Sequence, residues 1–163
     1  MAREYVLSTG NSTLTTVAGT LLTINPSTTV GFEVIRAWCG QAANATSAQQ
    51  RIQLATVLTS FAISNSAITP GKLKYNDPTS LFTANANVVT SGRCGTACTT
   101  EQTGTPVVLW EDAFNVLNGW LWVPTPRETI VIPPNSGAAF SMRFPTAPAT
   151  NTGWAFGIVY SEI

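Results

Sequence analysis

NGWLWVPTP, residues 118–126, joins a turn signal to two tryptophans and a Pro-x-Pro. Asn-Gly is the strongest short hairpin signal in a sequence, and as a two-residue type I′ turn it fixes which flanking residues oppose each other. Leu117 then opposes Trp120. Because side chains alternate along a strand, the sequence predicts a hairpin whose core face carries Phe114, Val116, Leu121 and Val123.

The opposite face of this predicted hairpin carries two indoles, and the sequence leaves their role open. The residues on this face are Asn115, Leu117, Trp120 and Trp122. One interpretation is a second core layer beneath a loop of the same chain. The other is a subunit or partner interface, where tryptophan is enriched at hot spots. A competing local interpretation makes Glu111 to Leu117 a short helix capped by Asn118-Gly119, which removes the hairpin register.

The rest of the chain reads as short strands about ten residues apart with turn residues between them, a pattern typical of a sandwich or barrel. We predict an all-β, antiparallel β-sandwich of jelly-roll type, with residues 13–163 as its single domain and residues 1–12 as an N-terminal arm or edge strand. Residues 60–105 should hold the longest loops, and Ala42 to Gln53 is a second candidate for a few helical turns. The predicted strands are Glu4–Leu7, Leu14–Val17, Thr20–Ile24, Val30–Trp38, Gln50–Leu58, Val107–Trp110, Trp120–Val123, Thr129–Ile132, Ala138–Phe144 and Gly153–Tyr160.

Alternation within these strands predicts which side chains share a face. In the strand from Val30 to Trp38, Phe32, Val34 and Arg36 should point one way, and Glu33, Ile35 and Ala37 the other. In the strand that begins at Ala138, one face should carry Phe140, Met142 and Phe144. Proline cannot donate to a strand ladder, so Pro124, Pro126, Pro133 and Pro134 should mark corners.

The composition indicates a polar but almost uncharged surface. Charged residues make up 10% of the 163 residues, and eight basic residues balance eight acidic ones, whereas a typical soluble domain has about 25% charged residues. Self-repulsion is therefore weak, and we expect copies of the chain to associate. Scattered lysines and arginines argue against nucleic acid as a partner. No apolar run suits a signal peptide or a membrane span, so we expect synthesis in a cytoplasm.

The sequence offers little reactive chemistry. Without histidine the chain cannot form Ser-His-Asp or Cys-His catalytic groups or most zinc sites. It also has no P-loop, dinucleotide fingerprint or Gly-x-Ser-x-Gly motif. The Cys94-x3-Cys98 motif with Cys39 lacks a fourth metal ligand, so we expect no metal, no cofactor and free thiols. Glu111-Asp112 beside Trp110 is a carboxylate pair of the kind used in glycoside hydrolysis, but a solvated turn or a salt bridge to Arg127 is the simpler interpretation.

The succession NGWLWVPTP, ETIVIPPNSGAAFSMRF and GWAFGIVYSEI, together with the low charge and the Thr-rich strands, resembles the jelly-roll head decoration, or cement, proteins of tailed bacteriophages. The resemblance is clearest over Val107–Ile163. It implies a virion protein without enzymatic activity that forms a homotrimer on the lattice of the major capsid protein. It also implies that residues 1–12 reach neighbouring molecules.

Three functional hypotheses follow. The first is a capsid decoration protein that stabilises a shell through surface contacts. The second is a carbohydrate-binding module or receptor-binding tip, with glycans as the partner of a tryptophan face and Glu111 and Asp112 as polar contacts. The third is a glycosidase that uses Glu111 or Asp112. The candidate interface or ligand-binding residues are Trp110, Asn115, Leu117, Trp120, Trp122 and Arg127.

Overall fold

The computed structural model describes residues 3–14, 19–42, 46–58, 66–85, 92–98, 101 and 104–163, and in these ranges the chain forms thirteen strands and no helix. Accordingly, the described residues contain no helix long and apolar enough to cross a membrane. The strands are β1 (Arg3–Ser12), β2 (Thr20–Asn25), β3 (Phe32–Gln41), β4 (Gln49–Leu58), β5 (Ser66–Ala67), β6 (Gly71–Lys72), β7 (Thr83–Ala84), β8 (Arg93–Thr96), β9 (Pro106–Asn115), β10 (Trp120–Trp122), β11 (Ile130–Ile132), β12 (Ala138–Arg143) and β13 (Trp154–Glu162).

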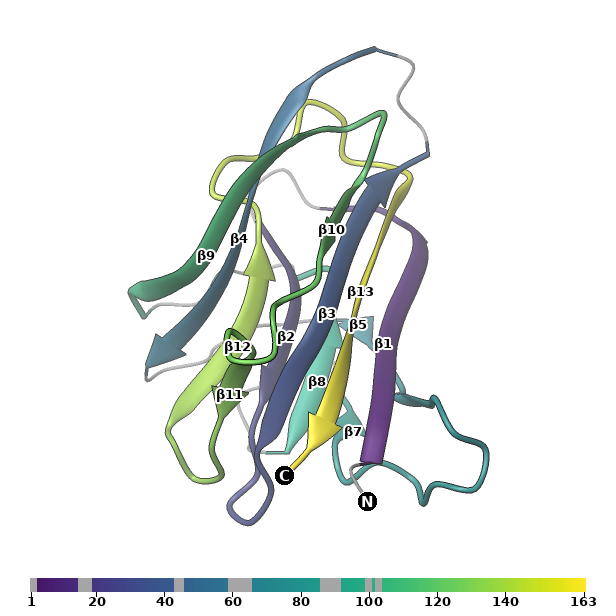
Figure 1. Cartoon of the computed structure of the whole chain (residues 1–163). Helices are drawn as coiled ribbons and strands as arrows, with labels where there is room; N and C mark the ends of the chain where they lie inside the picture. Colours follow the sequence, from purple (N-terminus) through teal and green to yellow (C-terminus); the bar gives the residue numbers. More distant parts are fainter. Residues whose placement is uncertain are drawn as a thin grey trace.

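The strands form two sheets packed face to face (Figure 1). Sheet A has the order β10-β3-β13-β1-β6. β11 pairs with the first part of β3, on the same side of β3 as β10. Sheet B has the order β5-β8-β2-β12-β4-β9, and β7 pairs with β8. Every pairing is antiparallel except that of β7 with β8. The central orders β1-β13-β3-β10 and β2-β12-β4-β9 are those of a jelly roll, which confirms the predicted fold class.

The core between the sheets is apolar and aromatic. Around one end, Phe32, Phe82 and Tyr160 make edge-to-face contacts, with ring centroids 5.4–6.1 Å apart. At the other end, Phe144 packs on Trp154 with a centroid distance of 4.8 Å. Such contacts add to the free energy gained from apolar burial. As predicted, Phe140, Met142 and Phe144 share the core face and are buried.

The alternation predicted along β3 is correct only in its first part. Phe32 and Val34 face the core, but a bulge then intervenes, because Val159 pairs with Arg36 while the next residue, Tyr160, pairs with Val34. The additional residue reverses the alternation, so Ala37 is buried and Arg36 is exposed. The prediction that Arg36 lies on the face of Phe32, and Ala37 on that of Glu33, is therefore wrong.

Other predicted segments have mixed outcomes. Residues 15–17 of the predicted strand Leu14–Val17 lie outside the described residues. Residues 3–12 form β1, which pairs with β13 along its length and with β6 over two residues. The helix predicted within Ala42–Gln53 is wrong where the structure describes it, since β4 begins at Gln49. All four corner prolines lie outside the strands, as predicted.

Candidate interaction surfaces

The turn between β9 and β10 connects the two sheets, so the predicted hairpin is wrong. β9 pairs with β4 in sheet B, whereas β10 pairs with β3 in sheet A. A turn closes where the Asn118 N–H donates to the Asn115 carbonyl at 3.0 Å. Gly119 follows with a φ of +71°, a backbone conformation that glycine adopts without strain. The helix predicted over Glu111–Leu117 is also wrong, because β9 continues to Asn115.

The change of sheet inverts the predicted faces of β10. Trp120 and Trp122 point into the sandwich and are only 8% and 5% exposed. Leu121 and Val123, predicted to lie in the core, are each 63% exposed. Phe114 and Val116 precede the crossing and are buried as predicted. The two indoles therefore form part of the core within the chain.

Trp110 is the indole of this group that remains accessible. It lies on β9, is 44% exposed, and its ring centroid is 6.4 Å from that of Trp122. It therefore covers Trp122 from one side while leaving part of its own ring in solvent. The carbohydrate hypothesis retains Trp110 as an exposed ring but loses Trp120 and Trp122 as a platform.

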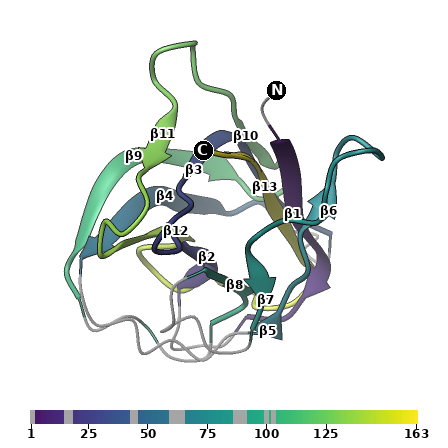
Figure 2. The ribbon, with the colours of Figure 1, turned by 90° about the horizontal axis from the view of Figure 1, so that it is seen from below.

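The remaining predicted site residues are divided between the β9–β10 turn, which holds Asn115 and Leu117, and a separate loop, which holds Arg127. Asn115 supports the turn, since its Oδ1 accepts from the Leu117 N–H at 3.0 Å and its Nδ2 donates to Ser47 Oγ at 2.6 Å. Leu117 is 50% exposed. Arg127 is exposed in the loop of residues 123–129, which projects from the body between β10 and β11 (Figure 2). Pro126 occupies the turn in which the Glu128 N–H donates to the Thr125 carbonyl.

Glu111 and Asp112 are neighbours on β9 and engage different partners. Glu111 pairs with Arg51, whose Nε donates at 2.7 Å, and accepts from Gln53 Nε2 at 2.8 Å. These hydrogen bonds, Gln53 first and Arg51 second, lower the pKa of Glu111. Asp112 instead accepts from Trp120 Nε1 at 3.1 Å and so joins β9 to β10. The predicted salt bridge to Arg127 is wrong for Glu111, because Arg51 takes that place.

The β9 edge, which we define as Val107, Val108, Leu109 and Trp110, is an apolar run at the margin of sheet B. These side chains are 48%, 42%, 44% and 44% exposed. Among the strands that the structure describes, β9 pairs only with β4. A register shift against Leu54 and Ala55 adds Leu109 as a bulge residue. Figure 1 shows β9 diverging from β10 with distance from their shared turn, so this half of the strand lies away from sheet A while it stays paired with β4.

A second apolar surface covers the outer side of sheet A. This sheet-A face consists of Ile35, Trp38, Leu73, Leu121, Val123 and Val131. Leu121 and Val131 are exposed because their chain neighbours on β10 and β11 point inward. Two shallow pockets of about 310 and 340 Å³ lie on this face. Large apolar side chains gathered in this way typically mark interaction sites.

Trp38 contributes to the sheet-A face through a close contact with a glycine. A Cβ added at Gly157 would collide with the Trp38 indole, so the ring lies directly over the backbone of β13. The Arg36 guanidinium is 5.8 Å from the ring centroid. Sequence analysis missed this site, although a glycine inside a predicted strand is a signal for close approach.

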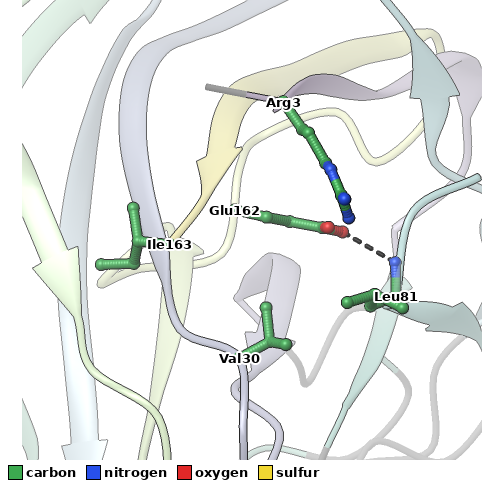
Figure 3. A pocket seen from close by; sticks show the side chains of 5 residues that line it. All are labelled: Arg3, Val30, Leu81, Glu162 and Ile163. Atoms are coloured by element: carbon green, nitrogen blue, oxygen red, sulfur yellow. Dashed lines mark hydrogen bonds between the residues drawn. The ribbon is translucent and has the colours of Figure 1, made fainter. Parts of the chain in front are cut away.

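A smaller pocket of about 230 Å³ lies at one end of the sandwich (Figure 3). Arg3 and Glu162 point toward each other across it. One Glu162 carboxylate oxygen accepts from the Leu81 N–H at 2.8 Å and from Ser80 Oγ at 2.6 Å. Ser80 also bonds to the hydroxyl of Tyr160 at 2.8 Å. This carboxylate therefore fastens the segment before β7 to the end of β13.

All three cysteines are buried thiols outside any disulfide, as predicted. Burial raises the pKa of each of them, that of Cys94 to about 12. They therefore stay protonated and poorly reactive at neutral pH. Within the described part of the chain, no group of three or more cysteine and acidic residues is placed to hold a metal ion.

Comparison of the chain with protein-family models, with curated proteins and with solved structures finds no match.

Proposed function

We propose that this protein is a non-enzymatic structural component of a viral particle, a capsid decoration or cement protein. In this role it forms a homo-oligomer, a trimer by the resemblance of its sequence, and binds the lattice of the major capsid protein. Glycans as partners of a receptor-binding tip are the alternative, and this alternative now depends on Trp110 alone.

The observation that carries the proposal is the large apolar area left in solvent on an almost uncharged domain. The β9 edge and the sheet-A face together hold ten large apolar side chains, of which eight are exposed and two, Ile35 and Trp38, are half-buried. Isolated exposed apolar residues are common, but contiguous groups mark interaction surfaces. A domain with two such surfaces suits repeated contacts in a shell.

A multivalent setting also accounts for the modest size of each surface. A decoration protein needs only weak contacts, since symmetry repeats each contact over the particle and the effective concentration is high. With eight basic and eight acidic residues, repulsion between neighbouring copies is small. The jelly roll is a fold of viral capsid proteins, and of lectins too, so the fold lends support by analogy only.

The experiment that tests the proposal images particles from the source with and without this gene product. Purified protein is then added to the bare shells. We expect it to occupy ordered positions on the lattice and to raise the temperature at which the shells rupture. Protein that stays monomeric at every concentration in light scattering and fails to bind bare shells would contradict the proposal, and a glycan array with specific hits would favour the alternative.

A further inference from the structure

We propose that the β9 edge is a docking site for a second copy of this chain, whose own β9 pairs with it antiparallel across a two-fold axis. The inference rests on the proposed function and deepens it by naming the partner of one surface. It joins the two B sheets of neighbouring molecules into one continuous sheet.

The side of β9 that faces away from β4 has no partner among the strands that the structure describes, and this determines the kind of occupant. A strand at a sheet margin presents a row of unpaired N–H and C=O groups, which are best satisfied by another extended strand. Many proteins protect such margins with lysine or proline. On β9, proline occurs only at Pro106, where the strand begins, and lysine does not occur at all. The apolar run from Val107 to Trp110 is therefore accessible to a partner strand.

The sequence of β9 is suited to pairing with itself. Only one antiparallel register places all four residues of the β9 edge in one copy opposite the same four residues in the second copy. The two-fold axis of this register lies between Val108 and Leu109. In this register Val107 opposes Trp110 of the second copy, and Glu111 opposes Pro106. The bulge at Leu109 turns Val107 and Trp110 to the same face of the strand, as opposed residues require. Facing apolar side chains stabilise strand pairs, whereas like charges directly opposite destabilise them.

Charge excludes the other half of the strand as the centre of the contact. An axis near Glu111 and Asp112 would bring the carboxylates of both copies together. Glu111 already has its cation in Arg51, and Asp112 already accepts from Trp120. The contact is therefore confined to the apolar half of β9, where no side chain is charged.

The expected ladder is short, and the contact is correspondingly weak. Pro106 lacks an N–H and ends the ladder on one side, the acidic residues end it on the other, and the bulge at Leu109 bends the strand between them. A weak two-fold contact fits a protein that acts in a lattice. Two-fold contacts between three-fold oligomers connect them into a net, and each contact is strengthened by its neighbours.

A matched pair of substitutions tests the site. Val108→Lys places a charge on the β9 edge, and Val131→Lys places one on the sheet-A face at a valine of similar exposure, 42% against 50%. Self-association is measured by sedimentation equilibrium over a range of concentrations. Val108→Lys should weaken dimer formation at least about tenfold, whereas Val131→Lys should change it by less than about twofold.

Cysteine cross-linking tests the register. Opposed residues have Cβ atoms within disulfide reach, and the three native thiols are buried. Mixed Val107→Cys and Trp110→Cys proteins should form a mixed disulfide faster than either protein links to itself. The control mixture, Val107→Cys with Leu121→Cys, should not cross-link, although Leu121, at 63%, is more exposed than Trp110, at 44%.

The outcomes separate this inference from the proposed function. Association that weakens with Val131→Lys but not with Val108→Lys, or cross-linking through Leu121→Cys alone, would overturn the β9 contact and leave the shell protein intact. Absence of a mixed Val107–Trp110 disulfide at concentrations where dimers form would overturn it as well. A protein that never associates and never binds shells would contradict both the β9 contact and the proposed function.

Discussion

Strands β9 and β10 follow each other along the chain and expose similar side chains very differently. On β9, the exposed fraction falls from 48% at Val107 to 6% at Phe114, close to the turn. On β10, Trp120 and Trp122 are almost fully buried. Both strands lie at a sheet margin, so the margin alone does not decide burial. The two strands diverge from their shared turn, and the apolar residues farthest from it on β9 lose the cover of the opposite sheet (Figure 1).

This difference indicates that the two strands have different roles. The tryptophans of β10 close the core, whereas the apolar run of β9 remains available to a neighbouring molecule. Trp110 lies where the two roles meet, since it both covers Trp122 and faces solvent.

The largest expected effect comes from truncating the buried indole. Trp122→Ala should lower the free energy of unfolding by about 3–5 kcal/mol, the usual cost of an aromatic cavity. Trp110→Ala should cost about 1–2 kcal/mol, because much of that ring is already in water. Urea denaturation measures both values. Equal losses of unfolding free energy for the two variants would contradict the difference in burial between β9 and β10.

A smaller effect is expected at the turn that separates them. Gly119 has a positive φ, and an added Cβ would lie 3.2 Å from the Cys39 carbonyl oxygen. Gly119→Ala should therefore cost about 1–2 kcal/mol, the price of left-handed backbone for an L-residue. Gly137→Ala is the matched control, with a similar φ of +64° and open space around its Cβ. Gly137→Ala should cost less, so an equal or greater loss at Gly137 would show that the turn at Gly119 is not constrained by β3.

The hydrogen bond from Trp120 to Asp112 joins the two strands through side chains. Asp112→Asn keeps an acceptor but removes its charge, so it should lower the free energy of unfolding by about 1 kcal/mol. Thermal unfolding of the variant, alongside Asp112→Ala, measures the effect. A neutral result for both substitutions would mean that the indole gains nothing from this acceptor.

The smallest expected effect is on the stability of the protein at low pH. Hydrogen bonds from Gln53 and Arg51 hold the pKa of Glu111 below its ordinary value of 4.5. The stability gained from the charged form is present above that value and is lost as the pH falls through the lowered pKa. Wild-type protein should therefore lose slightly more stability than Glu111→Gln between neutral pH and about pH 3. The urea midpoints of both proteins at both pH values measure this difference. A greater loss of stability in Glu111→Gln than in wild-type protein would contradict the lowered pKa of Glu111.

Much of the fold could be predicted from the sequence, because short strands and turn residues are local signals. The strands around Phe140 and Tyr160 and the corner prolines were predicted correctly. The partner of each strand was not predictable in the same way. Asn118-Gly119 permits a hairpin locally, but nine residue pairs with β4 hold β9 in the other sheet.

The candidate site was predicted only in part, for the same reason. Trp110 and Leu117 are accessible, but the faces of Trp120 and Leu121 are exchanged because the chain changes sheets between them. The bulge at Ile35 likewise reverses the predicted alternation for the residues after it. A one-residue shift moves every following side chain to the other face, and a single sequence does not reveal such shifts. Trp38 was missed because its position depends on a distant glycine, Gly157.

Amide hydrogen exchange of β9 and β10, in free protein and on shells, tests the central claim most directly. Exchange reports local opening and the loss of open hydrogen-bonding groups to a partner. Amides of Trp120–Trp122 that bond to β3 should be protected in both states, whereas amides of Val107–Trp110 that point away from β4 should exchange rapidly in dilute protein and become protected on the shell. Rapid exchange of Val107–Trp110 that persists on fully occupied shells would contradict the role assigned to this strand.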